Sequence, residues 1–204
     1  MQSTETLKYQ LTLKFCKIGD TLRTQFNIRD ICKSYLYVLA QKSGESAFMH
    51  VEENMTVVCL DFADAPNGQN RLAMEKIGHT DSMHSTAAGK VLLLEYSEEM
   101  LQKYLSTRGL PRRTDNTITD RKQFLTMLEH VRADGFAVDD EENEVGIRGI
   151  AAPIMDYEGK VIAAVGISSR ASRLNYYEIN RAKECVIETA AEISRVLGYR
   201  GIEE

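Results

Sequence analysis

The chain has 204 residues, 43% of them hydrophobic and 27% charged, and a formal net charge of −5. These values are ordinary for one globular domain with a real core and argue against intrinsic disorder. The acidic charge is unlike that of a module that holds DNA or RNA by itself, and no apolar stretch approaches the ~20 residues that span a bilayer.

The first third of the chain predicts an extended start, a helix and a hairpin. The apolar pattern of residues 7–22 fits both strand and helix, so we expect an extended segment that passes into a helix. Asn27 is then a suitable N-cap for a helix with one apolar face, which Gly44 would end. Residues 46–51 and 55–62 are strand-like and are joined by a polar turn, which predicts a hairpin.

The middle third predicts one further strand and three helices. The strand covers residues 71–77. The expected helix starts are marked by side chains that can cap a helix, namely Ser85 or Thr86, then Ser97, then Thr119 or Asp120. Gly135 would end the third of these helices.

The last third predicts mainly strands. A short strand at residues 136–138 leads into an acidic run at 139–144, and two small, apolar strands follow at 147–155 and 160–169. Asn175 can cap a final helix. Because hairpin turns outnumber crossover helices, the fold class is α+β, with one antiparallel sheet and helices packed on it.

Sequence motifs of common enzymes are absent. The chain has no G-x-S-x-G, HExxH, GxxxxGK[ST] or GxGxxG segment. Since neighbours on a regular element do not face each other, we interpret His84 as ordering a turn and Ser85 as a cap. The alternative is an enzyme that acts on a small metabolite, with His84 and Asp139 as acid and base.

Metal and redox sites are not expected either. The acidic run lacks the glycine of a calcium loop, so we interpret it as a solvated loop, except that Asp139 follows an apolar strand and belongs at the rim of the core. The cysteines are scattered and are interpreted as reduced core residues of a cytoplasmic protein: Cys16, Cys32, Cys59 and Cys185. Three histidines without a partner at ligand spacing are interpreted as surface or structural residues: His50, His79 and His130.

The start of the predicted helix in residues 83–90 is the most informative segment. A Ser/Thr-capped start made of small residues leaves backbone N–H groups uncovered, and such groups can hold a carboxylate or hydroxyl. Alternatively, the small residues only allow the helix to pack closely on the sheet. The residues alone leave both interpretations open.

Four motifs, in order along the chain, resemble those of the IclR-type bacterial transcription regulators. Residues 83–90 (MHSTAAGK) are similar to LHATAxGKA, 116–120 (NTITD) to RTITD, 135–142 (GFAVDDEE) to GYAxDDEE, and 144–154 (EVGIRGIAAPI) to ExGxRCIAAPI. The resemblance runs from about residue 9 to residue 197, nearly the whole chain.

The resemblance implies a GAF-like effector-binding domain in residues 26–204, with a curved antiparallel sheet, helices on both faces and a pocket under the loops. Residues 1–25 would be the end of a winged helix-turn-helix and its linker helix. We therefore expect either the sensor half of a longer regulator or a natural truncation. Such a domain forms dimers or dimers of dimers, needs no cofactor or membrane, and meets promoter DNA only through the missing N-terminal domain.

The resemblance also implies a set of ligand-binding residues: Met83, Ser85, Thr86, Ala87, Ala88, Asp139, Ile147, Gly149, Gly166 and Ser168. Asp81 is a further candidate, because residues 81–82 depart from the LP that is common in the family. Gly149 stands where the family often has Cys, which enlarges the pocket, and Asp81 would add a carboxylate near its mouth. Helix-start amides favour an anion, whereas an ionised Asp139 accepts hydrogen bonds. We therefore expect a small hydroxy-acid, sugar acid or aromatic acid as effector; a filled pocket would instead favour a purely structural dimerisation module.

Overall fold

The computed structural model describes residues 13–66 and 77–201, with side chains from residue 28 onward. Its helices are α1 (Leu13–Ser43), α2 (Ala87–Leu92), α3 (Glu98–Thr107), α4 (Arg121–Asp134) and α5 (Tyr176–Val196), with one 3₁₀ turn at Leu93–Glu95. Its strands are β1 (Ser46–Glu53), β2 (Thr56–Ala63), β3 (Thr80–Asp81), β4 (Ala137–Asp140), β5 (Ile147–Met155) and β6 (Val161–Arg170). Within these ranges no helix has the length and apolarity that crossing a bilayer requires.

The strands form one curled sheet in the order β3-β2-β1-β6-β5-β4, and every neighbouring pair is antiparallel. Strand β2 carries one extra residue, because Met49 pairs with Asp61 whereas the next residue, His50, pairs with Cys59. Leu60 is therefore a β-bulge. A bulge bends its strand and increases the local twist, so the sheet changes direction beside His50.

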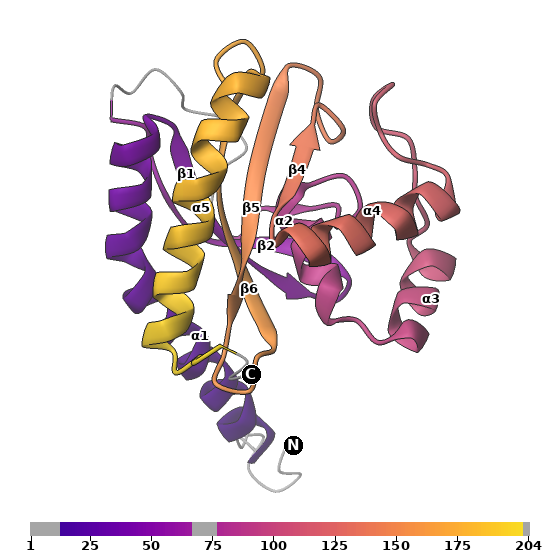
Figure 1. The fold of residues 1–204 in the computed structure, drawn as a ribbon. Helices are drawn as coiled ribbons and strands as arrows, with labels where there is room; N and C mark the ends of the chain where they lie inside the picture. The colour runs from indigo at the N-terminus through magenta and orange to yellow at the C-terminus, as the bar shows by residue number, and fades with distance from the viewer. Residues whose placement is uncertain (1–12, 67–76, 202–204) are drawn as a thin grey trace, which may run out of the picture.

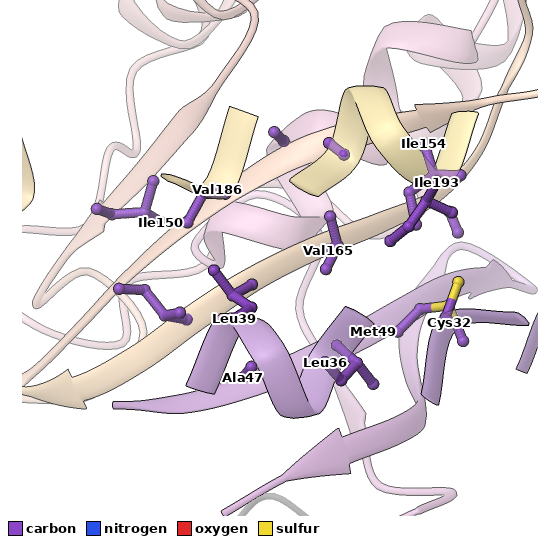
Figure 2. Close-up of a cluster of buried hydrophobic side chains, with 14 of the residues drawn as sticks. Cys32, Leu36, Leu39, Ala47, Met49, Ile150, Ile154, Val165, Val186 and Ile193 are labelled. Carbon is purple, nitrogen blue, oxygen red and sulfur yellow. The ribbon is translucent and has the colours of Figure 1, made fainter. Parts of the chain in front are cut away.

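The sheet separates two helical layers and two cores. Figure 1 shows α1 and α5 on one side of the sheet and α2, α3 and α4 on the other. The first core joins α1 and α5 to the sheet, and Figure 2 shows part of it: Cys32, Leu36, Leu39, Ala47, Met49, Ile150, Ile154, Val165, Val186 and Ile193. The second core lies around α2 and includes Val91, Leu92, Phe124 and Tyr104. The predicted fold, a curved antiparallel sheet with helices on both faces, is confirmed.

Polar side chains fix most helix starts where the sequence predicts them. Each of four caps accepts a hydrogen bond from a backbone N–H of the first turn that follows: Thr86 for α2, Ser97 for α3, Asp120 for α4 and Asn175 for α5. Gly135, with φ 75°, ends α4, and Gly44, with φ 73°, follows the end of α1. Glycine adopts this left-handed backbone without strain, so both stops follow from residue type.

One prediction for the N-terminal half differs from the structure. Helix α1 is continuous from Leu13, so Asn27 lies inside the helix instead of capping it. Residues 7–12, where the expected extended segment begins, lie outside the described residues. No proline interrupts residues 13–43, so the backbone hydrogen bonds can continue through Asn27. The predicted strand at residues 71–77 falls outside the described residues except for Ile77, which lies in a turn.

Candidate functional site

The first turn of α2 lies directly against the turn that precedes it. A Cβ at position 89 would come 2.2 Å from the Met83 Cα, so only glycine allows this approach. Thr86 caps the helix by accepting from the Gly89 N–H at 3.1 Å, and its own hydroxyl donates to the Ser82 carbonyl at 2.6 Å. Close packing therefore explains Gly89, but against the preceding turn and not against the sheet, as one of the two interpretations proposed. It does not account for the space beside Ala87.

A cavity of about 160 Å³ lies between the start of α2, the sheet and the β4–β5 loop. Since the share of one water in the liquid is about 30 Å³, a small metabolite fits. The lining contains most of the ligand-binding residues that the sequence analysis expects: Asp81, Thr86, Ala87, Ala88, Asp139, Ile147, Gly149 and Ser168. It also contains residues that the sequence analysis did not assign to ligand binding: Phe48, His50, Val57, His79, Asn143 and Glu144.

The structure places three of the expected residues outside this lining. Met83 is fully buried in the second core, where its sulfur accepts a hydrogen bond from the Tyr96 hydroxyl at 3.6 Å. Ser85 is fully buried and donates to the Asn143 side chain at 2.8 Å. A Cβ at Gly166 would come 2.0 Å from the Ile150 carbonyl oxygen, so this glycine serves the close approach of β6 and β5.

Gly149 leaves room between β5 and α2. A Cβ at this position would lie 3.5 Å from the Ile167 carbonyl oxygen, 3.8 Å from the Ala87 Cβ and 3.9 Å from the Asp139 Cβ. These are ordinary contact distances. The backbone therefore tolerates a side chain at position 149, and that side chain would occupy cavity space.

Asp139 ends the apolar part of β4 and organises the loop that follows. Its Oδ1 accepts hydrogen bonds from the backbone N–H groups of Glu142 at 2.8 Å and Asn143 at 3.2 Å. Burial raises the pKa of Asp139 to about 7, although the nearby Lys90 ammonium acts in the opposite direction. The carboxyl can therefore be neutral or ionised near neutral pH.

A buried ion pair connects α2 to the same loop. The Lys90 ammonium donates to the Glu142 carboxylate and to the Val138 carbonyl oxygen, the latter at 2.7 Å. Burial raises the pKa of Glu142, and the charge of Lys90 opposes this shift. Both side chains are buried, so the interpretation of the acidic run as a solvated loop is wrong for Glu142.

Two histidines also line the cavity: His50 lies in β1, and His79 directly precedes β3. His50 lies next to Phe48, with ring centroids 4.5 Å apart. Burial lowers the pKa of His50 to about 3, and the neighbouring His79 contributes in the same direction. The sequence analysis interpreted both histidines as surface or structural residues and did not predict that they line the cavity. The signal available in the sequence was the alternation of β1, which places Phe48 and His50 on one face.

The catalytic alternative lacks the geometry it needs. His84 does not line the cavity that contains Asp139. Its Nδ1 is 2.7 Å from the Ser82 hydroxyl and its Nε2 is 3.0 Å from the Pro111 carbonyl oxygen, so Nε2 donates and Nδ1 accepts. Both ring nitrogens are occupied, and burial lowers the pKa of His84. Among the described residues, no group of three or more His, Cys, Asp and Glu side chains could hold a metal ion.

Similarity to known proteins defines the class as the C-terminal domain of a bacterial transcriptional regulator. The family model described as "Bacterial transcriptional regulator IclR C-terminal" matches residues 21–195, and the chain belongs to this family. It is 29% identical over 198 residues to the HTH-type transcriptional regulator XynR of Escherichia coli, covering 97% of this chain and 78% of XynR. It is also 29% identical to E. coli KdgR, another HTH-type transcriptional regulator, over 97% of this chain and 74% of KdgR.

Solved structures agree with this assignment. IclR of Thermotoga maritima superposes with a TM-score of 0.80 at 32% identity, covering 98% of this chain and 79% of that chain. The inducer-binding domain of PobR from Acinetobacter, a double mutant in complex with 3-hydroxybenzoic acid, superposes with a TM-score of 0.76 at 29% identity, covering 82% and 97%. The relatives are named as transcriptional regulators, which points to a regulatory role that is not enzymatic.

Proposed function

We propose that this chain is the effector-sensing and oligomerising domain of a cytoplasmic IclR-type regulator. It binds a small organic acid, and binding modulates the contact of promoter DNA with a winged helix-turn-helix domain that precedes it. Residues 1–25 are the end of that DNA-binding domain and the linker, and residues 26–204 are the effector-binding domain. The partner for assembly is a second copy of the chain, in a dimer or a dimer of dimers with closed symmetry.

The observation that carries the proposal is the cavity between α2 and the β4–β5 loop. Among the described residues, the backbone N–H groups of Ala87 and Ala88 have no hydrogen-bond acceptor, and both residues line the cavity. Such N–H groups stabilise an anionic group. The PobR inducer-binding domain supports the proposal, because a related fold holds 3-hydroxybenzoic acid.

Charge restricts the effector further. The cavity lining includes three acidic residues, Asp81, Asp139 and Glu144, so a carboxylate placed beside any of them that is ionised meets like charge. The carboxylate therefore lies at the start of α2, where the N–H groups are. The rest of the effector carries groups that can donate to the carboxyl oxygens or to Ser168.

Ligand binding can change the regulator only if two states of the protein bind the effector differently. The end of β4 provides a contact for such a difference, because Asp139 lines the cavity and its neighbour Asp140 contacts α5. Asp140 accepts from the Arg148 Nε at 2.5 Å and from the Tyr176 hydroxyl at 2.8 Å, and Tyr176 is the first residue of α5.

Isothermal titration calorimetry against a panel of small hydroxy-acids, sugar acids and aromatic acids tests the proposal. We expect at least one acid to bind the wild-type chain, and we expect Gly149→Val to weaken its binding tenfold or more, on the order of the 1.4 kcal/mol that this factor represents. The valine Cβ would make only ordinary contacts, and its two methyl groups would add bulk beside Ala87 and Asp139. Thermal unfolding of this variant is the control for folding.

Two outcomes would contradict the proposal. Binding of neutral or cationic metabolites, with no binding of any acid, would exclude an organic-acid effector. Undiminished binding of the acid by a folded Gly149→Val variant would place the effector outside this cavity.

A further inference from the structure

His50 and His79 come together across strand β2. His50 of β1 pairs with Cys59 of β2, and the Cys59 backbone N–H donates to the His79 carbonyl oxygen at 2.9 Å. The electrostatic influence of His79 on His50 reflects the same proximity. Both residues line the cavity, and so does the start of α2, so the two histidines and the first turn of α2 border one space.

Each imidazole has an unsatisfied polar atom. The His50 Nδ1 and the His79 Nε2 are buried and have no hydrogen-bond partner among the described residues. Buried polar atoms are almost always hydrogen-bonded in folded proteins, because leaving one unpaired costs free energy. Two such atoms on neighbouring rings that line one cavity indicate that their partner is a molecule that enters the cavity.

The protonation state of His50 restricts what this partner can be. Burial keeps His50 neutral, and a neutral imidazole has one N–H donor and one nitrogen acceptor. A hydroxyl group both donates and accepts, so it complements such a ring. An ionised carboxylate only accepts, and it is better matched by the N–H groups at the start of α2.

We propose that His50 and His79 form a hydroxyl-recognition subsite, and that the effector is therefore a hydroxy-acid whose hydroxyl group lies between or beside the two rings. The carboxylate of the same molecule binds at the start of α2. This inference rests on the proposed function and deepens it. Phe48, packed against His50, supplies an apolar wall that holds the ring in place.

Matched pairs of acids test the subsite in the wild-type chain. The pairs are gluconate and hexanoate, 3-hydroxybutyrate and butyrate, and 3-hydroxybenzoate and benzoate, each titrated by calorimetry. Sites that hydrogen-bond a hydroxyl reject the analogue that lacks it, so we expect the hydroxy-acid of at least one pair to bind about tenfold tighter or more. Equal affinities within every pair would overturn the subsite while leaving an acid-binding cavity in place.

Variants then connect the discrimination to the two rings. His50→Phe and His79→Phe keep an aromatic ring but remove both nitrogens, and each should weaken the hydroxy-acid to the level of its deoxy analogue. The deoxy analogue makes no hydrogen bond to either ring, so its affinity should fall less than that of the hydroxy-acid, and the ratio of the two affinities should approach one. His50→Asn and His79→Gln return an amide close to the unsatisfied Nδ1 and Nε2 respectively, and each should recover part of the discrimination.

Circular dichroism and thermal unfolding identify variants that fail to fold. If His50→Phe does not fold, His79→Phe, which lies outside β1, still tests the subsite. Full discrimination in a folded His79→Phe variant would overturn the role of that ring. Failure of every acid to bind, deoxy analogues included, would contradict the proposed function itself, which separates the two failures.

Discussion

Asp139 has a carboxyl group whose protonation is linked to folding. Burial raises its pKa from 3.8 to about 7, so between these values the folded chain holds a proton that the unfolded chain releases. The free energy of unfolding therefore falls as pH rises through this window. A shift of about 3 pKa units corresponds to at most about 4 kcal/mol.

We expect Asp139→Asn to remove this fall, because an amide keeps the acceptor oxygen for the loop N–H groups but does not titrate. Urea unfolding of wild type and variant from pH 4 to pH 8 measures the difference. The comparison is needed because His50 has the opposite effect. Its pKa is lower in the folded chain than in the unfolded chain, so its contribution to the free energy of unfolding rises with pH between about 3 and 6.5. Asp134→Asn, at an exposed site, is the matched control; parallel wild-type and Asp139→Asn profiles would contradict the expectation.

The sequence predicts one side of the cavity better than the other. Thr86 and Asp139 lie in contiguous motifs whose local structure, a cap and a strand end, is set by near neighbours. His50 and His79 become neighbours only because β2 lies between them, and this pairing depends on a bulge that no local pattern marks. Residues brought together by long-range strand pairing are therefore the part of the site that single-sequence reasoning misses.

Helix α2 is short, and a charged side chain holds it in place. Lys90 is 1% exposed although it lies in a helix that is otherwise apolar, and it pairs with Glu142 of the β4–β5 loop. We expect Lys90→Met to destabilise the chain by about 3–5 kcal/mol, because it leaves a buried carboxylate without its cation. Denaturant unfolding at pH 7 measures this loss.

The double variant Lys90→Met/Glu142→Leu separates the ion pair from packing. Replacing both partners by apolar side chains removes the unpaired charge, so most of the lost stability should return. If the double variant is as unstable as the sum of the two single variants, the charges act independently and the interpretation of Lys90 as a partner of Glu142 fails.

At the level of elements, caps and glycine stops are predictable because they act within one turn. The caps of α3, α4 and α5 are confirmed at Ser97, Asp120 and Asn175. The predicted helix start at Asn27 is wrong, because an asparagine can stand at a cap and also inside a helix. Only the continuous helical backbone on both sides excludes the cap.

For the whole molecule, Figure 1 shows α2 and α5 on opposite sides of the sheet, and the start of α2 lines the cavity. Arg148 of β5 connects the end of β4 to α5, since its guanidinium pairs with Asp140 and lies 4.7 Å from the centre of the Tyr176 ring. A change at the end of β4 therefore has a direct contact with the first turn of α5.

We expect a bound effector to slow amide hydrogen exchange in the β4–β5 loop and in the first turn of α5. In Tyr176→Phe, which loses the hydrogen bond to Asp140 but keeps the ring, the protection of α5 should decrease while effector affinity changes little. Hydrogen-exchange mass spectrometry measures both segments. Tyr177→Phe is the matched control, and the same protection of α5 in Tyr176→Phe as in wild type would exclude this route.

The bulge at Leu60 has a consequence for how the ligand specificity of such a cavity can change. The change in direction of the sheet beside His50 comes from one additional main-chain residue in β2, not from the bulk of any side chain. The shape of the cavity is thus set by the backbone, while its chemical character depends on a few side chains that line it. Substitutions at these groups could retarget the domain to a different metabolite without rebuilding the scaffold.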